Sequence, residues 1–399
     1  MLVRMGLGMA VVVTGMTAIA EARSVPQSER EAAQIRQVLQ QVRLPPGFAI
    51  DLYAIVPGAR HMAVGPSGEV TFVGTRSAEL YAVVDRDRDG KVEAVEQFAP
   101  GLTFDAPNGP CFAPDGSLFV PEFDRIRMFE DAEKLQGGDV PAAVDVVPAG
   151  KLIPPEVNSQ NHGARVCRIG PDDRLYVAIG QPFNVPPKKL RDVFKQWGVG
   201  GIVRMDRDGA NREVFADGIR NSVGIDFRPG TSELWFSDNQ VDRMGDDIPP
   251  GEINRATQAG QNFGFPWYGG GTVRTAEYRD ERPPADAVPP VVEEVAHAAD
   301  LGLTFYTGTM FPETYRGGIF SAQHGSWNRS QPVGARVMFT AVGKDGTARD
   351  SVPLAEGWLA RSGEYLGRPV DVAPLPDGSI LVSDDLLGAL YRITYVAPE

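Results

Sequence analysis

Histidines are the side chains of this sequence best suited to proton transfer, and there are only four: His61, His162, His297 and His324. His162 stands in "NSQNHGARV", where polar residues and glycine predict a loop. A neutral imidazole in a loop can act as a general base near neutral pH. We therefore select His162 as the candidate catalytic residue. For the other three, a histidine held by structural hydrogen bonds is the alternative.

Three arginines are suited to an anionic ligand. Arg220 stands beside Asn221 in "GIRNSVGIDF", Arg329 lies in "SWNRS" and Arg368 lies in "GRPVDV". A guanidinium offers a rigid fork of N–H donors that matches a carboxylate or a quinone oxygen. Their positions beside strand-like segments predict a shared pocket, with ordinary salt bridges between neighbouring elements as the alternative.

A long segment rich in oxygen atoms, "WFSDNQVDRMGDDIPPGEIN", follows one of the predicted strands. Calcium takes six to eight oxygen ligands from carboxylates, amides and carbonyls. We predict that this segment binds calcium, and a solvated acidic loop is the alternative. The predicted ligands are Asp238, Asn239, Asp246 and Asp247.

A second acidic segment, "DRDRDGKVEAVE", has the spacing of a calcium-binding loop. The residues that fit the pattern are Asp85, Asp87, Asp89, Gly90 and Glu96. The segment before it, "ELYAVV", predicts a strand, whereas an EF-hand needs flanking helices. Equivalent segments elsewhere, "MDRDG" and "VGKDG", are typical of plain hairpin turns. A structural calcium site and an ordinary turn both remain open here.

The elements that must position these residues repeat along the chain. An apolar strand, a turn of Pro-Asp-Gly type and a second apolar strand recur at "MAVGPSGEVTFVG", "PCFAPDGSLFVPE", "CRIGPDDRLYVAIG", "IDFRPGTSELWFSDN" and "VDVAPLPDGSILVSDD". The turn prolines are separated by 48, 57, 58 and 147 residues, and the last interval holds one more unit, around "YRGGIFSAQHG", plus an insertion. Six units of this period predict an all-β, six-bladed β-propeller.

The repeat also predicts how the ring closes and where a ligand would bind. The strand "GFAIDLYAIV", residues 47–56, is expected to pair with "LYRITYV" and join the two ends of the propeller. A short helix is expected before it, near residues 29–42. Innermost strands converge on the central channel, so binding residues should gather on loops at one of its mouths. We take "GGIF" as the inner strand of the fifth blade, which places His324 at that mouth.

Composition limits the class of partner. The chain has 399 residues, 42% of them hydrophobic and 23% charged, with a net charge of -13. Such an acidic surface repels nucleic acid and anionic lipid, so a small molecule or another protein is the expected partner. Residues 1–22 predict a cleaved secretory signal peptide, because an arginine and an apolar run are followed by small residues, Ala18, Ala20 and Ala22, that fit a cleavage site. A membrane-spanning helix is the alternative, but the apolar run from Leu7 to Ala20 is shorter than the ~20 residues of a span. We therefore expect a periplasmic protein with no membrane span in the mature chain, a helical lead-in at 23–46 and the propeller at 47–399.

The sequence contains two cysteines, Cys111 and Cys167, and neither belongs to a metal-binding or haem-attachment motif. They occupy similar positions of successive repeats, which is typical of small core residues. Export also permits a disulfide. We interpret the pair as free core residues, with the disulfide as the alternative.

Several of these motifs, taken in order, resemble the sorbosone dehydrogenase and soluble glucose dehydrogenase family. The resemblance runs from "LPPGF" at Leu44 to "ALYRITY" and is carried by "GIRNSVGIDF", "SELWFSDN", "GDDIPPGEIN", "NFGFPW", "FYTGTMFP", "HGSWNR" and "GRPVDV". Members of that family are six-bladed propellers that use pyrroloquinoline quinone (PQQ) with calcium. The resemblance implies an oxidoreductase that takes a sugar or sugar aldehyde as substrate.

The resemblance also implies roles for individual residues. His162 matches the catalytic base, Arg220 and Asn221 match a quinone-contacting pair, and Arg368 matches one of two quinone-binding arginines. The loop after Ser237 matches the segment that holds the catalytic calcium. We add His324 and Arg329 to the quinone-binding set, and we assign sugar binding to Asn108, Asn161, Gln181 and Trp327.

This sequence departs from the family pattern at three positions. Asn161 replaces the aspartate that precedes the catalytic histidine, His324 replaces a cofactor-binding lysine, and Val370 replaces the second arginine. No haem motif is present, so electrons would pass to an external acceptor such as a cytochrome or the quinone pool. A calcium-dependent propeller lactonase and a non-catalytic carbohydrate-binding propeller are the alternative functions.

Overall fold

A computed structural model describes residues 23–134, 142–157 and 159–398 of the chain. The signal peptide expected at residues 1–22 lies outside this range. Within the described residues, no helix has the length and apolar character needed to cross a membrane.

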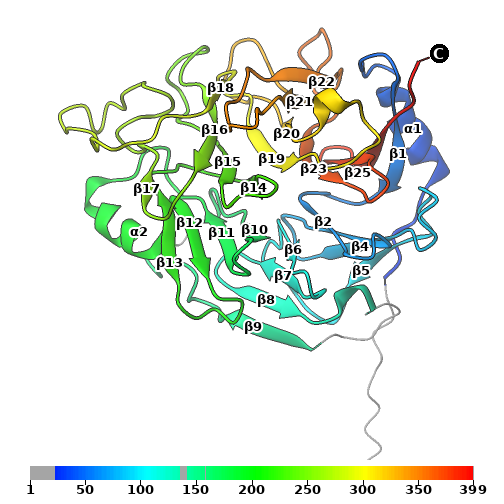
Figure 1. Cartoon of the computed structure of the whole chain (residues 1–399), viewed down its shortest axis with the longest axis horizontal. Helices are drawn as coiled ribbons and strands as arrows, with labels where there is room; N and C mark the ends of the chain where they lie inside the picture. Colours follow the sequence, from blue (N-terminus) through cyan, green and yellow to red (C-terminus); the bar gives the residue numbers. More distant parts are fainter. Residues whose placement is uncertain (1–22, 135–141, 158, 399) are drawn as a thin grey trace, which may run out of the picture.

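Six sheets surround a central axis, and the chain passes through them in sequence order except at β1 and β17 (Figure 1). The strands within each four-stranded blade pair antiparallel. The first blade is formed by β2 (Met62–Val64), β3 (Val70–Val73), β4 (Leu80–Val84) and β5 (Ala94–Phe98). The second is formed by β6 (Cys111–Phe112), β7 (Leu118–Pro121), β8 (Ile126–Phe129) and β9 (Ala143–Val147). The third is formed by β10 (Val166–Ile169), β11 (Leu175–Ile179), β12 (Gly201–Met205) and β13 (Glu213–Asp217), with β17 (Gln261–Asn262) added in parallel at its edge.

The remaining blades complete the ring. The fourth is formed by β14 (Ile225–Phe227), β15 (Leu234–Asp238), β16 (Gly251–Ala256) and β18 (Val292–Glu294). The fifth is formed by β19 (Asp300–Phe305), β20 (Ile319–Gln323), β21 (Arg336–Thr340) and β22 (Val352–Glu356). The sixth is formed by β23 (Pro369–Pro374), β24 (Ile380–Asp384), β25 (Ala389–Tyr395) and β1 (Phe48–Ile55).

The closing blade confirms the expected pairing of the two ends of the propeller. Strand β1 runs antiparallel to β25, from Phe48 opposite Tyr395 to Ile55 opposite Ala389, and the two lie side by side in Figure 1. Helix α1 (Glu29–Leu39) precedes β1, is capped by the Ser28 hydroxyl and buries an apolar face. The predicted six-bladed propeller with a short N-terminal helix is therefore confirmed.

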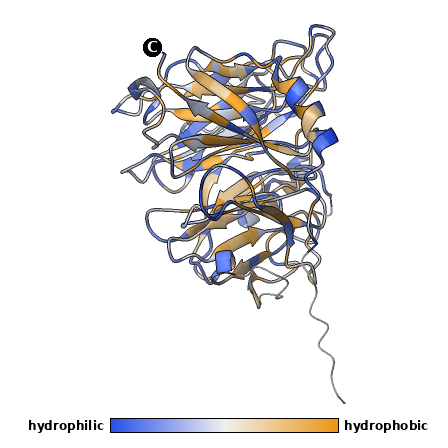
Figure 2. Ribbon diagram, turned by 90° about the vertical axis from the view of Figure 1, so that its right-hand side faces the viewer, coloured by the Kyte–Doolittle hydropathy of each residue, from blue (hydrophilic) through white to orange (hydrophobic). Residues whose placement is uncertain are grey.

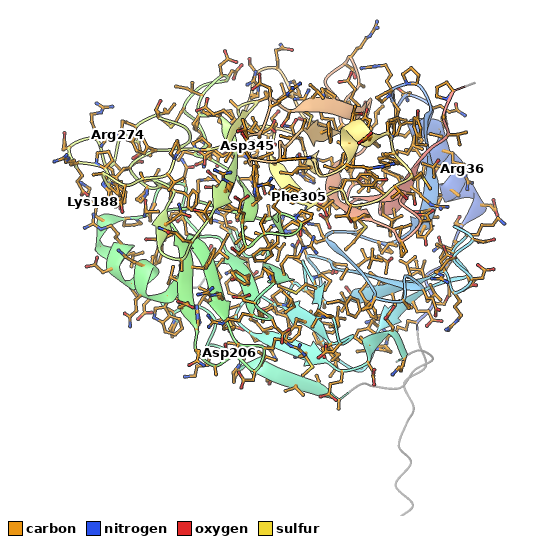
Figure 3. The ribbon with its side chains drawn as sticks, in the orientation of Figure 1. Arg36, Lys188, Asp206, Arg274, Phe305 and Asp345 are labelled. Atoms are coloured by element: carbon orange, nitrogen blue, oxygen red, sulfur yellow. A yellow bond between two sulfur atoms is a disulfide. The ribbon has the colours of Figure 1, made fainter. Side chains whose placement is uncertain are left out.

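Apolar side chains between neighbouring sheets form the core. Hydrophobic residues concentrate along the strands, and polar residues concentrate in the loops (Figure 2). Figure 3 shows Phe305, at the end of β19, near the middle of the ring, whereas Asp206 and Arg274 lie at its edge. Short helices lie outside the blades: α2 (Arg191–Trp197), η1 (Ala132–Lys134), η2 (Lys188–Leu190) and η3 (Glu313–Tyr315).

The order of strands in the fifth blade corrects one expectation. Strand β19 is innermost and β20, which contains the "GGIF" segment, is second. His297 therefore precedes the innermost strand, and His324 follows the second one. The prediction that "GGIF" is the innermost strand was wrong because β19 and β20 are joined by a long loop with no Pro-Asp-Gly turn to mark the hairpin.

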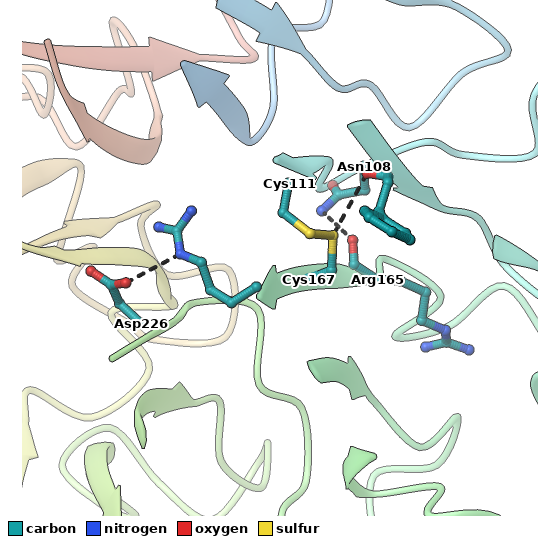
Figure 4. The surroundings of a disulfide bond; sticks show 7 residues. Asn108, Cys111, Arg165, Cys167 and Asp226 are labelled. Carbon is teal, nitrogen blue, oxygen red and sulfur yellow. Dashed lines mark hydrogen bonds and ion pairs between the residues drawn. A yellow bond between two sulfur atoms is a disulfide. The ribbon is translucent and has the colours of Figure 1, made fainter. Parts of the chain in front are cut away.

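A disulfide joins Cys111 of β6 to Cys167 of β10, so the interpretation of these cysteines as free core residues is wrong (Figure 4). The innermost strands of adjacent blades converge towards the axis, and this brings equivalent positions to a Cα separation of 5.5 Å. The similar repeat positions that suggested packing are thus what makes the bond possible.

Candidate functional site

A polar pocket lies at one mouth of the central channel. It encloses about 110 Å³. Its walls come from loops that precede innermost strands and from loops that join second to third strands, which all open on the same face of a propeller. The lining residues are His162, Arg220, Asn221, Asn239, Gln240, Asp242, Pro249, Gly251, His297, Ala299, Asp300, Trp327 and Asn328.

His162 is held in one orientation by the backbone around it. Its Nδ1 lies 2.5 Å from the Gln181 carbonyl oxygen, and Arg165 donates to the His162 carbonyl at 2.7 Å. A carbonyl only accepts hydrogen bonds, so Nδ1 carries the proton and Nε2 carries the lone pair of the neutral ring. Among the described residues, none forms a hydrogen bond with Nε2. The free lone pair of Nε2 gives the pocket a proton acceptor.

Glycine at position 180 makes this arrangement possible. A Cβ there would lie 2.3 Å from Asn221 Oδ1 and 2.9 Å from the His162 Cβ. Any larger side chain would push the two site residues apart.

Burial, followed by the positive charge of Arg220, lowers the pKa of His162 to about 4. The imidazole is therefore neutral at pH 7 and ready to accept a proton. A carboxylate next to it is not required for the correct tautomer, because the Gln181 carbonyl fixes it.

Arg220 is buried and already has protein partners. It donates to the Asn184 carbonyl at 3.0 Å, to the Asn239 carbonyl at 3.0 Å, to Asn184 Oδ1 at 2.9 Å and to Asp242 Oδ2 at 2.7 Å. Four of its five N–H groups are thus engaged. These contacts fix the guanidinium beside the pocket and leave one donor for a ligand.

Buried carboxylates lie beneath the pocket. Asp238 accepts the backbone N–H groups of Arg220 and Asn221, and the Gln240 amide bridges Asp238 at 2.9 Å to Glu252 at 2.7 Å. Burial raises the pKa of both carboxyl groups, and the charge of Asp238 raises that of Glu252 further. Asp238, a predicted calcium ligand, therefore anchors the Arg220–Asn221 turn from below.

Three amide oxygens that belong to pocket residues are buried without a hydrogen-bond donor. Within the described residues, Asn221 Oδ1, Gln240 Oε1 and Asn328 Oδ1 have no partner. The amide nitrogens of Gln240 and Asn328 donate to carboxylates, which fixes the oxygens as the free atoms. Unpaired buried acceptors are costly, and neutral oxygens in this number suit a hard cation such as calcium.

Trp327 and His297 complete the rim. The Trp327 side chain is 64% exposed, and Arg243 lies 5.7 Å above its ring. His297 Nε2 contacts the carbonyls of Gly245 and Ile248 at 2.8 and 3.0 Å, and its Nδ1 lies 3.4 Å from the Asn328 amide. Trp327 thus offers an open aromatic face to a ligand, whereas His297 orders the loops around it.

His324 belongs to a separate buried network near the axis. Its Nε2 lies 2.7 Å from Asp385, which Arg60 contacts at 2.8 Å. Burial lowers the pKa of His324 to about 4, so the ring is neutral at pH 7. Arg368 donates to the carbonyls of His324 and Gly325 at 3.0 and 2.7 Å. Neither His324 nor Arg368 lines the polar pocket.

The remaining residues predicted to bind the quinone or calcium lie in two different parts of the structure. Arg329 donates to the Asp246 and Ala296 carbonyls and pairs with Asp247 at 3.2 Å, so these three predicted site residues hold one exposed loop together. Asn239 does line the pocket, where its amide donates to the Asp300 carbonyl at 2.7 Å.

The predicted sugar-binding residues are also dispersed. Asn108 is fully buried between Arg60 and His61, at 3.0 Å from each. Asn161 is exposed beside His162, and Gln181 is buried, with its backbone holding His162. Of the four, only Trp327 lines the polar pocket.

The first-blade loop brings three of its four predicted ligands together. Carboxylate oxygens of Asp85, Asp87 and Asp89 all lie within 4.8 Å of one another. Glu96 lies in β5 opposite Ala82, outside this cluster, because an extended strand carries it away from the loop at about 3.3 Å per residue.

A second, larger cavity of about 470 Å³ lies beside α2 and β17. Its lining is mainly apolar and aromatic and includes Trp267, Phe265 and Gln181. It contains no histidine and none of the unpartnered amide oxygens. We therefore place the chemistry in the smaller pocket.

Sequence reasoning missed Gln240 and Asp300 as site residues, and it placed Asn328 at the channel mouth without giving it a role. Asp300 begins an innermost strand, which is a position that the repeat could have singled out. Gln240 and Asn328 stand beside chosen residues, in "SDNQ" and "SWNR". Their amide oxygens are buried without a partner because of how the neighbouring blades pack, which the sequence alone does not show.

Three comparisons with known proteins bear on this site. The family model described as Glucose / Sorbosone dehydrogenase matches residues 151–326. An uncharacterized protein of Borreliella burgdorferi is 31% identical over 368 residues, which cover 90% of this chain and 92% of that protein. An aldose sugar dehydrogenase of Escherichia coli strain K12 is 23% identical over 263 residues, which cover 60% of this chain and 62% of that enzyme.

Among solved structures, the holo form of the pyranose dehydrogenase PQQ domain from Coprinopsis cinerea superimposes with a TM-score of 0.69 at 19% sequence identity. The match covers 89% of this chain and 97% of that domain. Fold and site together define a six-bladed propeller with a polar, oxygen-rich pocket at the mouth of its channel. The chain belongs to the glucose/sorbosone dehydrogenase family, as its motifs predicted, and it is a sugar-dehydrogenase-like propeller.

Proposed function

We propose that this protein is a periplasmic, PQQ-dependent oxidoreductase that oxidises a sugar or sugar aldehyde with the help of calcium. Its electrons would pass to an external acceptor, a cytochrome or the quinone pool. The observation that carries the proposal is that one pocket is lined both by His162, whose neutral ring is fixed, and by three residues whose buried amide oxygens have no partner among the described residues. Membership of the family and the PQQ-containing structural neighbour support it.

The residues of the pocket fit the cofactor pair. Calcium would be held by the free oxygens of Asn221, Gln240 and Asn328, which have no other donor among the described residues. PQQ is a planar quinone with carboxylate groups, so it needs both a cation and fixed N–H donors. Arg220 would supply its remaining N–H and its positive charge. When bound with calcium, PQQ supplies a two-electron acceptor that takes hydride from the substrate carbon.

His162 would perform the proton transfer. Its Nε2 would accept the hydroxyl proton of the sugar as the hydride leaves the adjacent carbon. The Gln181 carbonyl, 2.5 Å from Nδ1, would stabilise the imidazolium that results. With a pKa of about 4, that imidazolium would release its proton to water readily, so the base would return to its neutral form after each turnover.

The departures from the family pattern have local substitutes. A backbone carbonyl at Gln181 would orient His162 in place of an aspartate at position 161. His324 is neutral and bound to Asp385, so Arg220 would be the principal charged group for the quinone. Arg368 would act through the backbone of the His324 loop, which it holds in place.

Reconstitution tests the proposal. The purified protein is treated with EGTA, supplied with PQQ, calcium or both, and assayed by dye reduction with a panel of aldoses and sugar aldehydes. We expect reduction only when both are present. Lactone hydrolysis with calcium alone would overturn the proposal in favour of a propeller lactonase, and sugar-dependent stabilisation without either activity would favour a binding protein.

A further inference from the structure

The loop between β4 and β5 gathers three carboxylates on the face of the propeller opposite the polar pocket. Strands alternate in direction within a blade, so the loops that follow first and third strands lie away from the mouth that His162 occupies. The loop carries Asp85, Asp87 and Asp89, whose carboxylate oxygens lie within 4.8 Å of one another. The proposed function uses none of these residues.

The burial of Asp85 points to a missing ligand. Its side chain is buried, and its Oδ2 accepts from the Tyr53 hydroxyl at 3.0 Å and from the Gly90 N–H at 3.1 Å. Its Oδ1 is also buried and has no hydrogen-bond partner within the described residues. A buried carboxylate oxygen without a donor is unfavourable unless a cation satisfies it.

The equivalent loop of the third blade, between β12 and β13, satisfies its first aspartate, Asp206, with hydrogen bonds from the chain. There Arg174 donates to Asp206 Oδ1 at 2.9 Å, and Asn211 donates to Asp206 Oδ2 at 2.6 Å. Asp206 is 40% exposed, and both of its oxygens still have donors from the chain itself. The first-blade loop has no such donor for Asp85 Oδ1 among the described residues.

The positive groups nearby do not reach that oxygen. Lys91 pairs with Asp89 at 2.9 Å, but its side chain is 86% exposed, and exposed pairs of this kind contribute little. Arg392 lies against Gly90, where it is bound to Ser379 and Asp377. The positive charges of Lys91 and Arg392 weaken the attraction of the loop carboxylates for a cation. Neither side chain takes the place of a cation at Asp85 Oδ1.

We propose that Asp85, Asp87 and Asp89 bind one calcium ion that stabilises the seam between the first and last blades. The site offers only oxygen ligands, three of them carboxylates, which favours calcium over zinc. Tyr53 belongs to β1 of the closing blade, so the Asp85–Tyr53 hydrogen bond couples the ion to the closure of the ring. Glu96 is absent from the ligand set, so we expect half-saturation at about 10⁻⁴–10⁻³ M. This site is independent of the proposed function.

Terbium luminescence tests the site directly, because Tyr53 stands next to it and can sensitise a bound terbium ion. The full chain is titrated with Tb³⁺ under tyrosine excitation, and calcium is then added as competitor. We expect a saturable signal that calcium reverses and that Tyr53→Phe removes. Asp87→Asn combined with Asp89→Asn should raise the half-saturating terbium concentration about tenfold or more. Both aspartates are exposed, so the folded state should be retained.

Two controls separate this site from others. Asp208→Asn changes the matched loop of the third blade and should leave the titration unchanged, whereas Asn221→Ala removes a ligand of the proposed catalytic calcium and should also leave the Tyr53-dependent signal intact. A signal that persists in Tyr53→Phe, or a titration unaltered by the double substitution, would overturn the proposal. These outcomes do not depend on PQQ, so they are distinguishable from a failure of the proposed function.

Discussion

The two oxygen clusters of this propeller differ in the charge of their ligands and in what surrounds them. At the channel mouth, three pocket residues carry unpartnered neutral amide oxygens, and the fixed guanidinium of Arg220 belongs to the same pocket. At the opposite face, three carboxylates stand together, and one of them is linked to Tyr53. Neutral oxygen ligands do not neutralise the positive charge of a bound cation. The first cluster therefore suits an ion that also contacts an anionic cofactor. Carboxylates neutralise the ion themselves, so the second suits an ion that only stabilises the fold.

The largest effect is expected at the proposed base. His162→Ala should lower turnover of the reconstituted enzyme by about 10²–10⁴-fold, because the substrate proton loses its acceptor. Quinone binding, measured by absorbance titration, should stay nearly unchanged. Turnover within a few-fold of the wild type would remove His162 from the mechanism.

A smaller effect is expected from the arginine at the pocket. Arg220→Lys keeps the charge but loses the fork that contacts Asn184, Asn239 and Asp242. We expect the apparent affinity for PQQ to fall about tenfold, since a lysine replaces several fixed donors with one mobile group. The control is Arg329→Lys, which alters an arginine outside the pocket lining. An equal loss of affinity in both variants would contradict the assignment.

The pH dependence provides a third test. Because the pKa of His162 is lowered to about 4 in the folded protein, its neutral form predominates at all higher pH values. The ratio kcat/KM should therefore stay flat from neutral pH down to about 5 and fall about tenfold per pH unit below about 4. An acid limb near 6.5, the ordinary histidine value, would show that the site does not hold the imidazole neutral.

The smallest effect is expected at the opposite face. Asp87→Asn should reduce the rise in Tm that calcium gives the wild type, by a few degrees at most, because a weak structural site adds stability only in proportion to its occupancy. Dye-reduction activity in saturating PQQ and calcium should stay within about twofold. A large loss of activity would mean that the two clusters are coupled.

The repeat pattern predicted the fold well because turn chemistry is local. Each Pro-Asp-Gly type turn between apolar strands specifies a hairpin, and six hairpins leave a closed ring as the natural arrangement. The exception was the fifth blade, where the loop between β19 and β20 carries no such turn. There the innermost strand was assigned to the wrong segment.

The candidate site was predicted only in part. His162, Arg220, Asn221 and Trp327 meet in the pocket because they stand on loops at the same mouth. The partners that define their chemistry, such as the Gln181 carbonyl for His162 and Asp242 for Arg220, depend on how distant loops meet. The Cys111–Cys167 bond is of the same kind, since it depends on the approach of two innermost strands. Such contacts leave no periodic signal in one sequence.

The most direct test of the proposed function is a titration of PQQ into protein stripped with EGTA, followed by visible absorbance, with and without added calcium. The quinone should bind saturably at micromolar concentration when calcium is present, and binding should be lost when calcium is withheld or when Asn221→Ala removes one of the free oxygens. Failure of PQQ to bind with calcium present would contradict the proposal that this pocket is the site of a quinoprotein.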